Sequence, residues 1–320
     1  MTRLGYQIPN FTYPGVGPDA LFDVVVEQAK AADRSGFDTV LVMDHFYQLP
    51  YSGDPEQYML ECYTTLAALA RETSSVRLSA LVTGNTYRNP AFLAKTVTTL
   101  DIVSGGRAQL GIGAGWYELE HDSYGFEFGT FTDRFQKLEE SLQIVIPMLR
   151  GARPTFEGEH YRAHEAMNEP PPISRIPVMI GGSGERKTLR LVAQYADESN
   201  LICTLAETAR KLDVLAGHCE AVGRDRSQIT VTQHVSVCIA PTHDQAVADL
   251  DADLERNGRT GEMADMARAR TVLGDPDEVA EQLSAYLDAG VDGWTVSATA
   301  NGMVPGRLEL LGETASKLLV

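Results

Sequence analysis

The sequence has 320 residues, of which 43% are hydrophobic and 22% are charged. This composition is typical of a globular protein with a large core and argues against disorder. The 44 acidic and 27 basic residues give a formal net charge of -17, which argues against a surface that binds nucleic acid or an anionic membrane.

Short apolar runs alternate with longer amphipathic segments along the chain. Eight strands are predicted at residues 4–8, 38–43, 76–82, 107–112, 178–180, 199–203, 229–239 and 293–296. Helices are predicted at residues 19–35, 63–72, 90–105, 133–149, from 185 onward, and at 206–222, 276–289 and 309–319. Two polar helices, 244–256 and 263–269, are inserted after the seventh strand, and residues 151–174 are predicted to be a surface excursion.

Several helix ends carry their own signals. Asp19 is a candidate N-cap and Gly36 a stop for the first helix, while Pro90 is suited to the first turn of the third. Gly290 ends the helix before the last strand. These signals divide the chain into regular strand and helix units.

The segment 176–190 combines a buried strand, three glycines and the start of a helix. Gly181, Gly182 and Gly184 let the backbone approach a ligand, and we predict that the helix begins at Glu185. Free N–H groups and the positive end of a helix dipole favour a phosphate at such a place. A tight turn that binds nothing is the alternative.

The order of the elements favours one single-domain TIM barrel, of the (β/α)8 type, over residues 1–320, with insertions after strands four and seven. An open Rossmann sheet is the alternative, and it depends on Gly111, Gly113 and Gly115. Trp116 occupies the position at which the dinucleotide fingerprint needs its third glycine, so we prefer the barrel.

In a parallel barrel, the residues that follow the strands lie together at one rim. Asp44 and His45 directly follow an apolar strand, and such a pair would be costly to bury without partners, so we expect it to face a site. The alternative is that Asp44 caps local N–H groups and His45 packs in the interior.

Other residue types exclude other chemistries. All six lysines fall on predicted helices, which argues against a Schiff-base aldolase, and the remaining histidines do not gather at the rim as a metal hydrolase requires. We expect His234, in the middle of a strand, to lie in the core. The four cysteines are far apart and form no CxxC pair, so we expect reduced thiols without a zinc site.

The N-terminus reads as a strand rather than as a signal sequence. No apolar run reaches the length of about 18 residues that a spanning helix needs. A cytoplasmic enzyme without metal is therefore expected. A rim with two glycine loops, one histidine and few nucleophiles suits a cofactor that carries the chemistry itself.

Four segments resemble the luciferase-like monooxygenase superfamily, and more narrowly its branch that uses the deazaflavin coenzyme F420. They are VMDHF, SALVTGNTYRNP, SGGRAQLGIGAGWYELEH and IPVMIGGSGERKTLRLVAQYAD. The closing pattern LGDPDEVAEQLSAYLDAGVDGW is also similar to that superfamily, so the resemblance covers essentially the whole chain.

The resemblance implies where a cofactor would lie. Asp44 and His45 would flank the deazaflavin, with His45 beside the carbon that exchanges hydride. Ala80 and Leu81 match the place where the family has a bulged, non-prolyl cis peptide, and Thr83 would contact the cofactor tail. The phosphate and side chain would be held by two glycine-rich segments, Gly113, Ala114 and Gly115, and Gly181, Gly182, Ser183 and Gly184.

One position departs from the sugar-phosphate dehydrogenase branch of this family. That branch has a glutamate after the glycine loop, proposed as a catalytic acid, where this chain has Trp116, so we do not predict a sugar phosphate as substrate. Glu118 or Glu120 could provide an acid from the same loop, and we name Glu120 with Asp44 and His45 as candidate catalytic residues. A solvated loop is the alternative for both glutamates.

The resemblance implies hydride transfer between F420 and an unidentified organic substrate, with His45 as proton donor or acceptor. The alternatives are an FMN-dependent monooxygenase and a flavin- or deazaflavin-binding protein without catalysis. Family members are commonly homodimers, so self-association is expected. The substrate pocket is expected among residues 48–57, 116–131 and 244–270, with Phe46, Tyr47, Tyr51, Tyr117 and Tyr124 as candidate lining residues.

Overall fold

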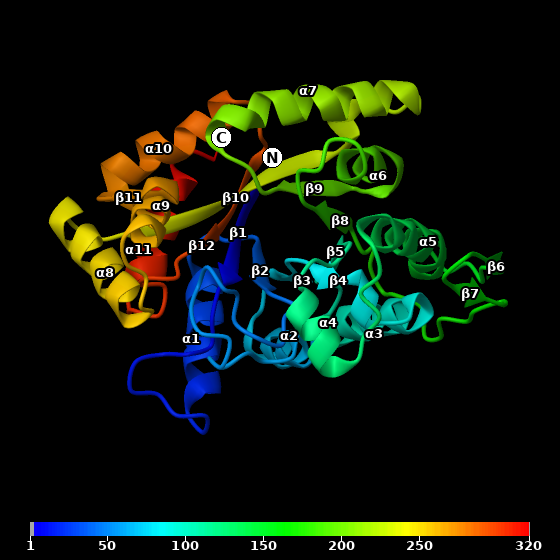
Figure 1. Cartoon of the computed structure of the whole chain (residues 1–320), viewed down its shortest axis with the longest axis horizontal. Coiled ribbons are helices and arrows are strands. Elements are labelled where there is room, and N and C mark those ends of the chain that lie inside the picture. The colour runs from blue at the N-terminus through cyan, green and yellow to red at the C-terminus, as the bar shows by residue number, and fades with distance from the viewer. Residues whose placement is uncertain (1–2, 320) are drawn as a thin grey trace.

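The computed structural model describes residues 3–319, and its centre is a closed barrel of parallel strands (Figure 1). The barrel strands, in the order in which they pair, are β1 (Arg3–Ile8), β2 (Thr39–Val42), β3 (Arg77–Ala80), β5 (Ala108–Gly113), β8 (Val178–Gly181), β9 (Glu198–Leu201), β10 (Thr230–Ile239) and β12 (Gly293–Ser297). The ring closes where β1 pairs with β12, with Leu4 opposite Trp294. The predicted TIM barrel is confirmed.

Helices surround the strands, as expected from the alternation in the sequence (Figure 1). They are α1 (Leu21–Arg34), α2 (Cys62–Glu72), α3 (Pro90–Ser104), α5 (Phe131–Leu149), α6 (Thr188–Tyr195), α7 (Leu205–Ala221), α10 (Pro276–Asp288) and α11 (Arg307–Ser316), with 3-10 turns η1 (Asn85–Tyr87) and η2 (Arg226–Gln228). None of the helices within residues 3–319 is both long and apolar enough to cross a membrane.

The barrel strands are buried on both faces because helices cover the outside and side chains fill the inside. Every residue of β2 and of β12 is buried. Outward side chains such as Leu4, Val40 and Leu78 join the main core with the helices, whereas Leu41 and Met179 form a smaller cluster with Leu81. This double burial explains why the strands read as continuous apolar runs in the sequence.

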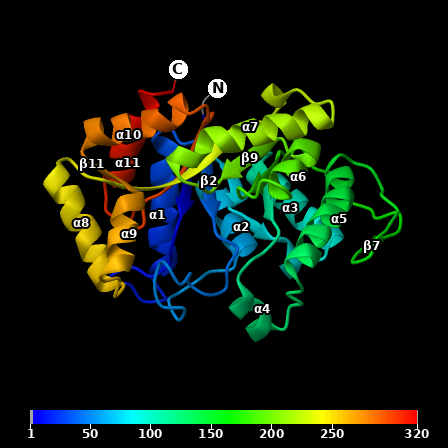
Figure 2. The ribbon, with the colours of Figure 1, turned by 45° about the horizontal axis from the view of Figure 1, so that its top comes forward.

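Insertions follow the fourth and seventh barrel strands, as predicted. The first contains α4 (Glu118–Tyr124), and the second contains α8 (His243–Arg256), α9 (Glu262–Arg270) and the edge strand β11 (Thr271–Gly274). Figure 2 shows α4, α9 and the loop after β2 at the end of the barrel opposite the chain termini. Short strands also occur as β4 (Thr83–Gly84) and as the hairpin β6 (Phe156–Glu157) and β7 (Arg162–Ala163).

Three local predictions were wrong. Asp19 does not cap α1, because the helix begins at Leu21 and its N-cap residue is Ala20. The helix after the glycine-rich turn begins at Thr188 rather than at Glu185, since the Glu185 carboxylate accepts hydrogen bonds from Arg210 and Lys211 of α7 and residues 185–187 form a turn. The segment after Trp116 is not only a loop, since it contains α4.

Candidate active site

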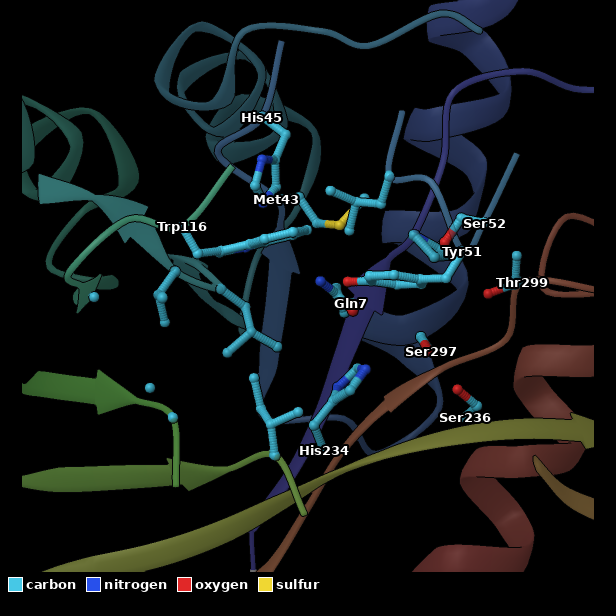
Figure 3. Close-up of a pocket in the computed structure, with 18 of the residues that line it drawn as sticks. Gln7, Met43, His45, Tyr51, Ser52, Trp116, His234, Ser236, Ser297 and Thr299 are labelled. Atoms are coloured by element: carbon cyan, nitrogen blue, oxygen red, sulfur yellow. The ribbon is translucent and has the colours of Figure 1, made fainter. Parts of the chain in front are cut away.

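A cavity of about 760 Å³ opens at the carboxyl ends of the barrel strands. Its walls come from the ends of the strands, from the segment after β2, from the loop after β5 and from the insertion after β10. Figure 3 shows His45, Trp116, Tyr51 and His234 around this space. Ligand sites of TIM barrels lie at this end of the fold, so the cavity is the candidate active site.

His45 lies in the cavity wall, and a buried carboxylate holds its ring. The Nδ1 atom of His45 donates to Glu120 Oε2 over 2.8 Å, and Glu120, on α4, is fully buried. The Tyr87 hydroxyl also donates to Glu120 over 2.6 Å, and the backbone N–H groups of Phe46 and Tyr47 donate to its other oxygen. The anchored Nδ1 leaves Nε2 as the ring nitrogen available to the cavity.

The neighbours of Glu120 keep it ionised. Burial raises the pKa of the Glu120 carboxyl, but the hydrogen bond and positive charge of His45, with the bonds from Tyr87 and Tyr47, bring the pKa below its ordinary value. The alternative, in which Glu120 belongs to a solvated loop, is wrong, because Glu120 is buried and lies in α4. Glu120 does not line the cavity, so it acts on the site through His45. Glu118, two residues earlier in the same helix, is exposed and does not line the cavity either.

Asp44 is buried beside His45 and is paired with an arginine. Its carboxylate accepts two hydrogen bonds from Arg88, of 2.6 and 2.9 Å, and one of 2.9 Å from the Gly84 N–H. The charge of Asp44, assisted by its hydrogen bonds, overcomes the effect of burial and raises the pKa of the Arg88 guanidinium. The negative charge of Asp44 is thus neutralised inside the wall.

A non-prolyl cis peptide joins Leu81 and Val82, one residue after the pair that the resemblance indicated. The bulge pushes Val82 toward two neighbouring strand ends. A Cβ atom at Gly113 would lie 2.8 Å from Val82, and one at Gly181 would lie 2.7 Å from it. These two glycines are therefore required by the packing of the bulge, and not only by the approach of a ligand.

The glycine-rich turn after β8 is only partly open to the cavity. Gly181 and Gly182 line it, whereas Ser183 and Gly184 do not. The Gly182 N–H donates to the Asn200 carbonyl oxygen over 2.9 Å, so it is already satisfied. Thr188, the first residue of α6, also lines the cavity, so the start of the helix reaches the same wall as the turn.

Of the other residues predicted to contact the cofactor, all but Ala80 line the cavity. Thr83, Ala114 and Gly115 line the cavity, and the Thr83 hydroxyl is paired with that of Tyr63 at 2.7 Å. Ala80 is buried behind the wall and does not line the cavity, whereas Leu81 does. Gly115 has a φ of +79°, which suits a glycine.

Of the predicted aromatic lining residues, Tyr51 alone lines the cavity. Phe46, Tyr47 and Tyr124 belong to a cluster of rings beside it, in which Phe46 and Tyr124 stack with centroids 4.5 Å apart. Tyr117 packs in a buried cluster with Met43 and Leu49. These aromatic residues support the loops that carry His45 and Glu120.

The sequence analysis did not predict one wall of the cavity, which consists mainly of polar residues. Gln7 of β1, His234 and Ser236 of β10, Ser297 of β12 and Thr299 line it (Figure 3). The prediction that His234 lies in the core is wrong. Strand β10 continues to Ile239, but the ring of His234 faces the cavity. Residues two apart in a strand share a face, so the polar pair at 234 and 236 was the available signal.

The sequence is similar to known proteins of one family. The family model described as luciferase-like monooxygenase matches residues 2–293. The F420-dependent glucose-6-phosphate dehydrogenase of Segniliparus rotundus is 30% identical over 84% of this chain and 85% of its own.

Solved structures of proteins with different names have the same fold. An F420-dependent secondary alcohol dehydrogenase in complex with an F420-acetone adduct covers 98% of both chains with a TM-score of 0.81 and 19% identity. EDTA monooxygenase from Chelativorans sp. BNC1 covers 99% of this chain and 93% of its own, with a TM-score of 0.82 and 18% identity. The match of the family model over most of the sequence places this chain in the luciferase-like monooxygenase family.

Proposed function

We propose that the protein is an F420-dependent oxidoreductase that transfers hydride between F420 and an organic substrate. The sequence relative from Segniliparus rotundus carries that cofactor in its name and aligns with most of the chain. The observation that carries the proposal is the His45 ring in the cavity wall, anchored to Glu120 at 2.8 Å.

The residues of the cavity fit a flat cofactor with an anionic tail. The bulge at Leu81 and Val82 offers an apolar surface for a ring, and Thr83 lies next to it in the wall. Gly115 and Thr188 would take the phosphate, since Gly115 has no side chain in the way and Thr188 is the first residue of helix α6. F420, when bound, would supply the hydride donor or acceptor.

His45 would carry the proton that accompanies the hydride. Glu120 accepts a hydrogen bond from Nδ1, which fixes the tautomer and orients the ring so that Nε2 is the free nitrogen. Nε2 can then give a proton to a carbonyl oxygen or take one from an alcohol. Asp44, which Arg88 neutralises, would hold the rim in place and would not carry a proton.

Turnover with F420 tests this function. Cofactor-loaded protein is incubated with alcohols and carbonyl compounds, and the change of the deazaflavin absorbance is followed. We expect the His45→Gln variant to lose about 100-fold or more in turnover with little change in F420 affinity. His164→Gln, at an exposed histidine away from the cavity, is the control and should keep full turnover. Full turnover of the His45→Gln variant would exclude this role for His45.

A further inference from the structure

Four large side chains with apolar surface line the cavity and are open to solvent. Tyr51, Trp116, Met263 and Met266 all line it, with 60, 49, 51 and 53% of each residue exposed. Such exposure is costly for large apolar groups unless a partner covers them. The segments that carry them come from three separate insertions or loops, so the apolar surface forms only in the folded barrel.

Two of the aromatic rings form a wall beside His45. The rings of Trp116 and His45 meet edge to face with centroids 5.7 Å apart. Trp116 and Tyr51 are nearly parallel, at 19°, with centroids 6.3 Å apart. Figure 3 shows both rings entering the cavity with similar orientation, close to His45 and Met43. A flat apolar group could lie against these rings near the proton carrier.

Helix α9 adds a flexible apolar surface. Met263 and Met266 are three residues apart, so they lie on one side of the helix. Methionine side chains adapt to irregular partners because they are unbranched and polarisable. This surface favours binding of hydrocarbon rather than of a sugar.

The opposite wall offers neutral hydrogen-bonding groups. Gln7, Ser236, Ser297 and Thr299 present amide and hydroxyl groups near His234 (Figure 3). His234 Nδ1 and the Thr295 hydroxyl lie 3.4 Å apart, and burial lowers the pKa of His234 to about 4, so its ring is neutral at pH 7. This wall suits one polar, uncharged group of a ligand.

Most charged side chains in the cavity wall are occupied within the protein. Asp44 is paired with Arg88, and Asp253 with Arg259 at 2.5 Å. Arg134 donates to the Gly115 and Gly129 carbonyl oxygens. Arg270 lines the cavity and is exposed, and neither Arg270 nor Arg134 has an ion pair within residues 3–319, so these two arginines are the groups that an anionic substrate would use.

We propose that the substrate is an uncharged, largely apolar ring compound with one reacting carbonyl group, or the corresponding alcohol. This inference rests on the proposed F420 function. In the reduction, two electrons and one hydrogen pass as hydride from reduced F420 to the carbonyl carbon, and the oxygen takes a proton from His45 as the C=O π bond becomes an O–H bond. The products are the alcohol and oxidised F420, and the reverse reaction restores the carbonyl compound.

The experiment measures both binding and turnover of two probes. Acetophenone represents the proposed class, and glucose 6-phosphate represents a charged sugar. Calorimetric titration of protein saturated with F420 gives the Kd of each probe. Absorbance then follows the oxidation of reduced F420 by acetophenone, and the reduction of F420 by glucose 6-phosphate.

We expect acetophenone to bind saturably and to oxidise reduced F420. Trp116→Ala should weaken acetophenone binding about tenfold or more, whereas Trp116→Phe should stay within about threefold, because the phenyl ring keeps the stacking surface. Phe92→Ala is the matched control, since Phe92 is an exposed aromatic residue outside the cavity. Its acetophenone affinity should not change.

Two results would overturn the inference. The first is that the protein binds and oxidises glucose 6-phosphate and does not bind acetophenone. In that case, Arg270→Ala should abolish the binding of glucose 6-phosphate. The second is F420-loaded protein that binds neither probe. If the protein does not bind F420 at all, the proposed function fails as well, and the cofactor titration shows this separately.

Discussion

At the scale of single residues, Glu120 is the group on which the site geometry depends. Its carboxylate is fully buried and accepts hydrogen bonds from His45, Tyr87 and the backbone N–H groups of Phe46 and Tyr47. A buried carboxylate needs such partners, because its desolvation would otherwise cost several kcal/mol, on the order of 5. These contacts join α4 to the segments after β2 and β3 and orient the His45 ring.

Replacement of Glu120 by glutamine should affect both turnover and acid stability. We expect Glu120→Gln to lower turnover about tenfold or more, because the His45 ring loses the carboxylate that orients it. The pKa of Glu120 is lowered in the folded protein, so its contribution to stability is present above its ordinary value and is lost as the pH falls through the lowered one.

Urea denaturation at several pH values below about pH 4.5 checks this. The free energy of unfolding of the Glu120→Gln variant should depend less on pH in that range than that of the unsubstituted protein. An equal pH dependence of the two proteins, together with unchanged turnover of the variant, would mean that the Glu120 carboxylate neither stabilises the fold through its charge nor orients His45.

His234 makes a separate contribution to pH dependence. Burial lowers its pKa from 6.5 to about 4, so the unfolded chain binds a proton at a higher pH than the folded one. The stability that depends on neutral His234 is therefore complete above about pH 6.5 and is lost as the pH falls toward about 4.

The variant His234→Gln should show a smaller loss of unfolding free energy between these pH values. The exposed His164 provides the control, and His164→Gln should follow the unsubstituted protein. Thermal or urea unfolding at pH 7 and pH 5 measures both. Parallel curves for all three proteins would show that folding does not lower the pKa of His234.

At the scale of elements, the insertion after β10 is fastened to the loop after β2. Arg259 pairs with the buried Asp253 and donates to the Tyr51 carbonyl oxygen over 3.3 Å, and Gln57 donates to Asn257 over 2.9 Å. These bonds hold Tyr51 opposite α9, so the apolar part of the cavity depends on them.

Removal of the arginine should loosen this connection. Arg259→Ala leaves the Asp253 carboxylate buried without its main partner, and we expect it to cost about 3 kcal/mol of stability and to raise KM for the substrate. Arg268→Ala breaks an exposed pair with Asp251 in the same insertion and should cost less than about 1 kcal/mol. Denaturant unfolding measures both, and equal losses would contradict the account.

The sequence predicts some elements better than others for a physical reason. Strands such as β10 and helices such as α10 are long or strongly patterned, and α10 has a complete capping box of Asp275 and Glu278. Helix α4 has seven mostly polar residues, and short helices depend on tertiary contacts, here the burial of Glu120 and His121. Its local sequence therefore indicates only a polar loop.

At the scale of the whole molecule, the closure of the barrel brings together residues that are distant in the sequence. Gln7, His45 and His234 meet at one cavity because β1 pairs with both β2 and β12, and β12 with β10. The rim could be predicted from strand ends, and so His45 was found. His234 was not, because β10 is ten residues long and its burial inside the barrel depends on register.

The sequence also does not predict which residues near the strand ends form the cavity wall. The cis bond at Leu81 and Val82 is one position later than the resemblance indicated. The Val82 side chain fills the space that side chains at Gly113 and Gly181 would need. A sequence motif indicates which residue types lie near the site. The packing at the ends of β3, β5 and β8 determines which of these residues face the cavity.

The most direct test of the central claim is titration with F420 and, separately, with FMN, followed by tryptophan fluorescence. The chain has two tryptophans. Trp116 lines the cavity, whereas Trp294 is fully buried in strand β12 and does not line the cavity. Quenching of Trp116 therefore reports the cavity, and Trp116→Phe should remove most of the signal. An F420-dependent enzyme should bind F420 saturably at micromolar concentration and should not bind FMN. Micromolar binding of FMN without binding of F420 would contradict the proposed function.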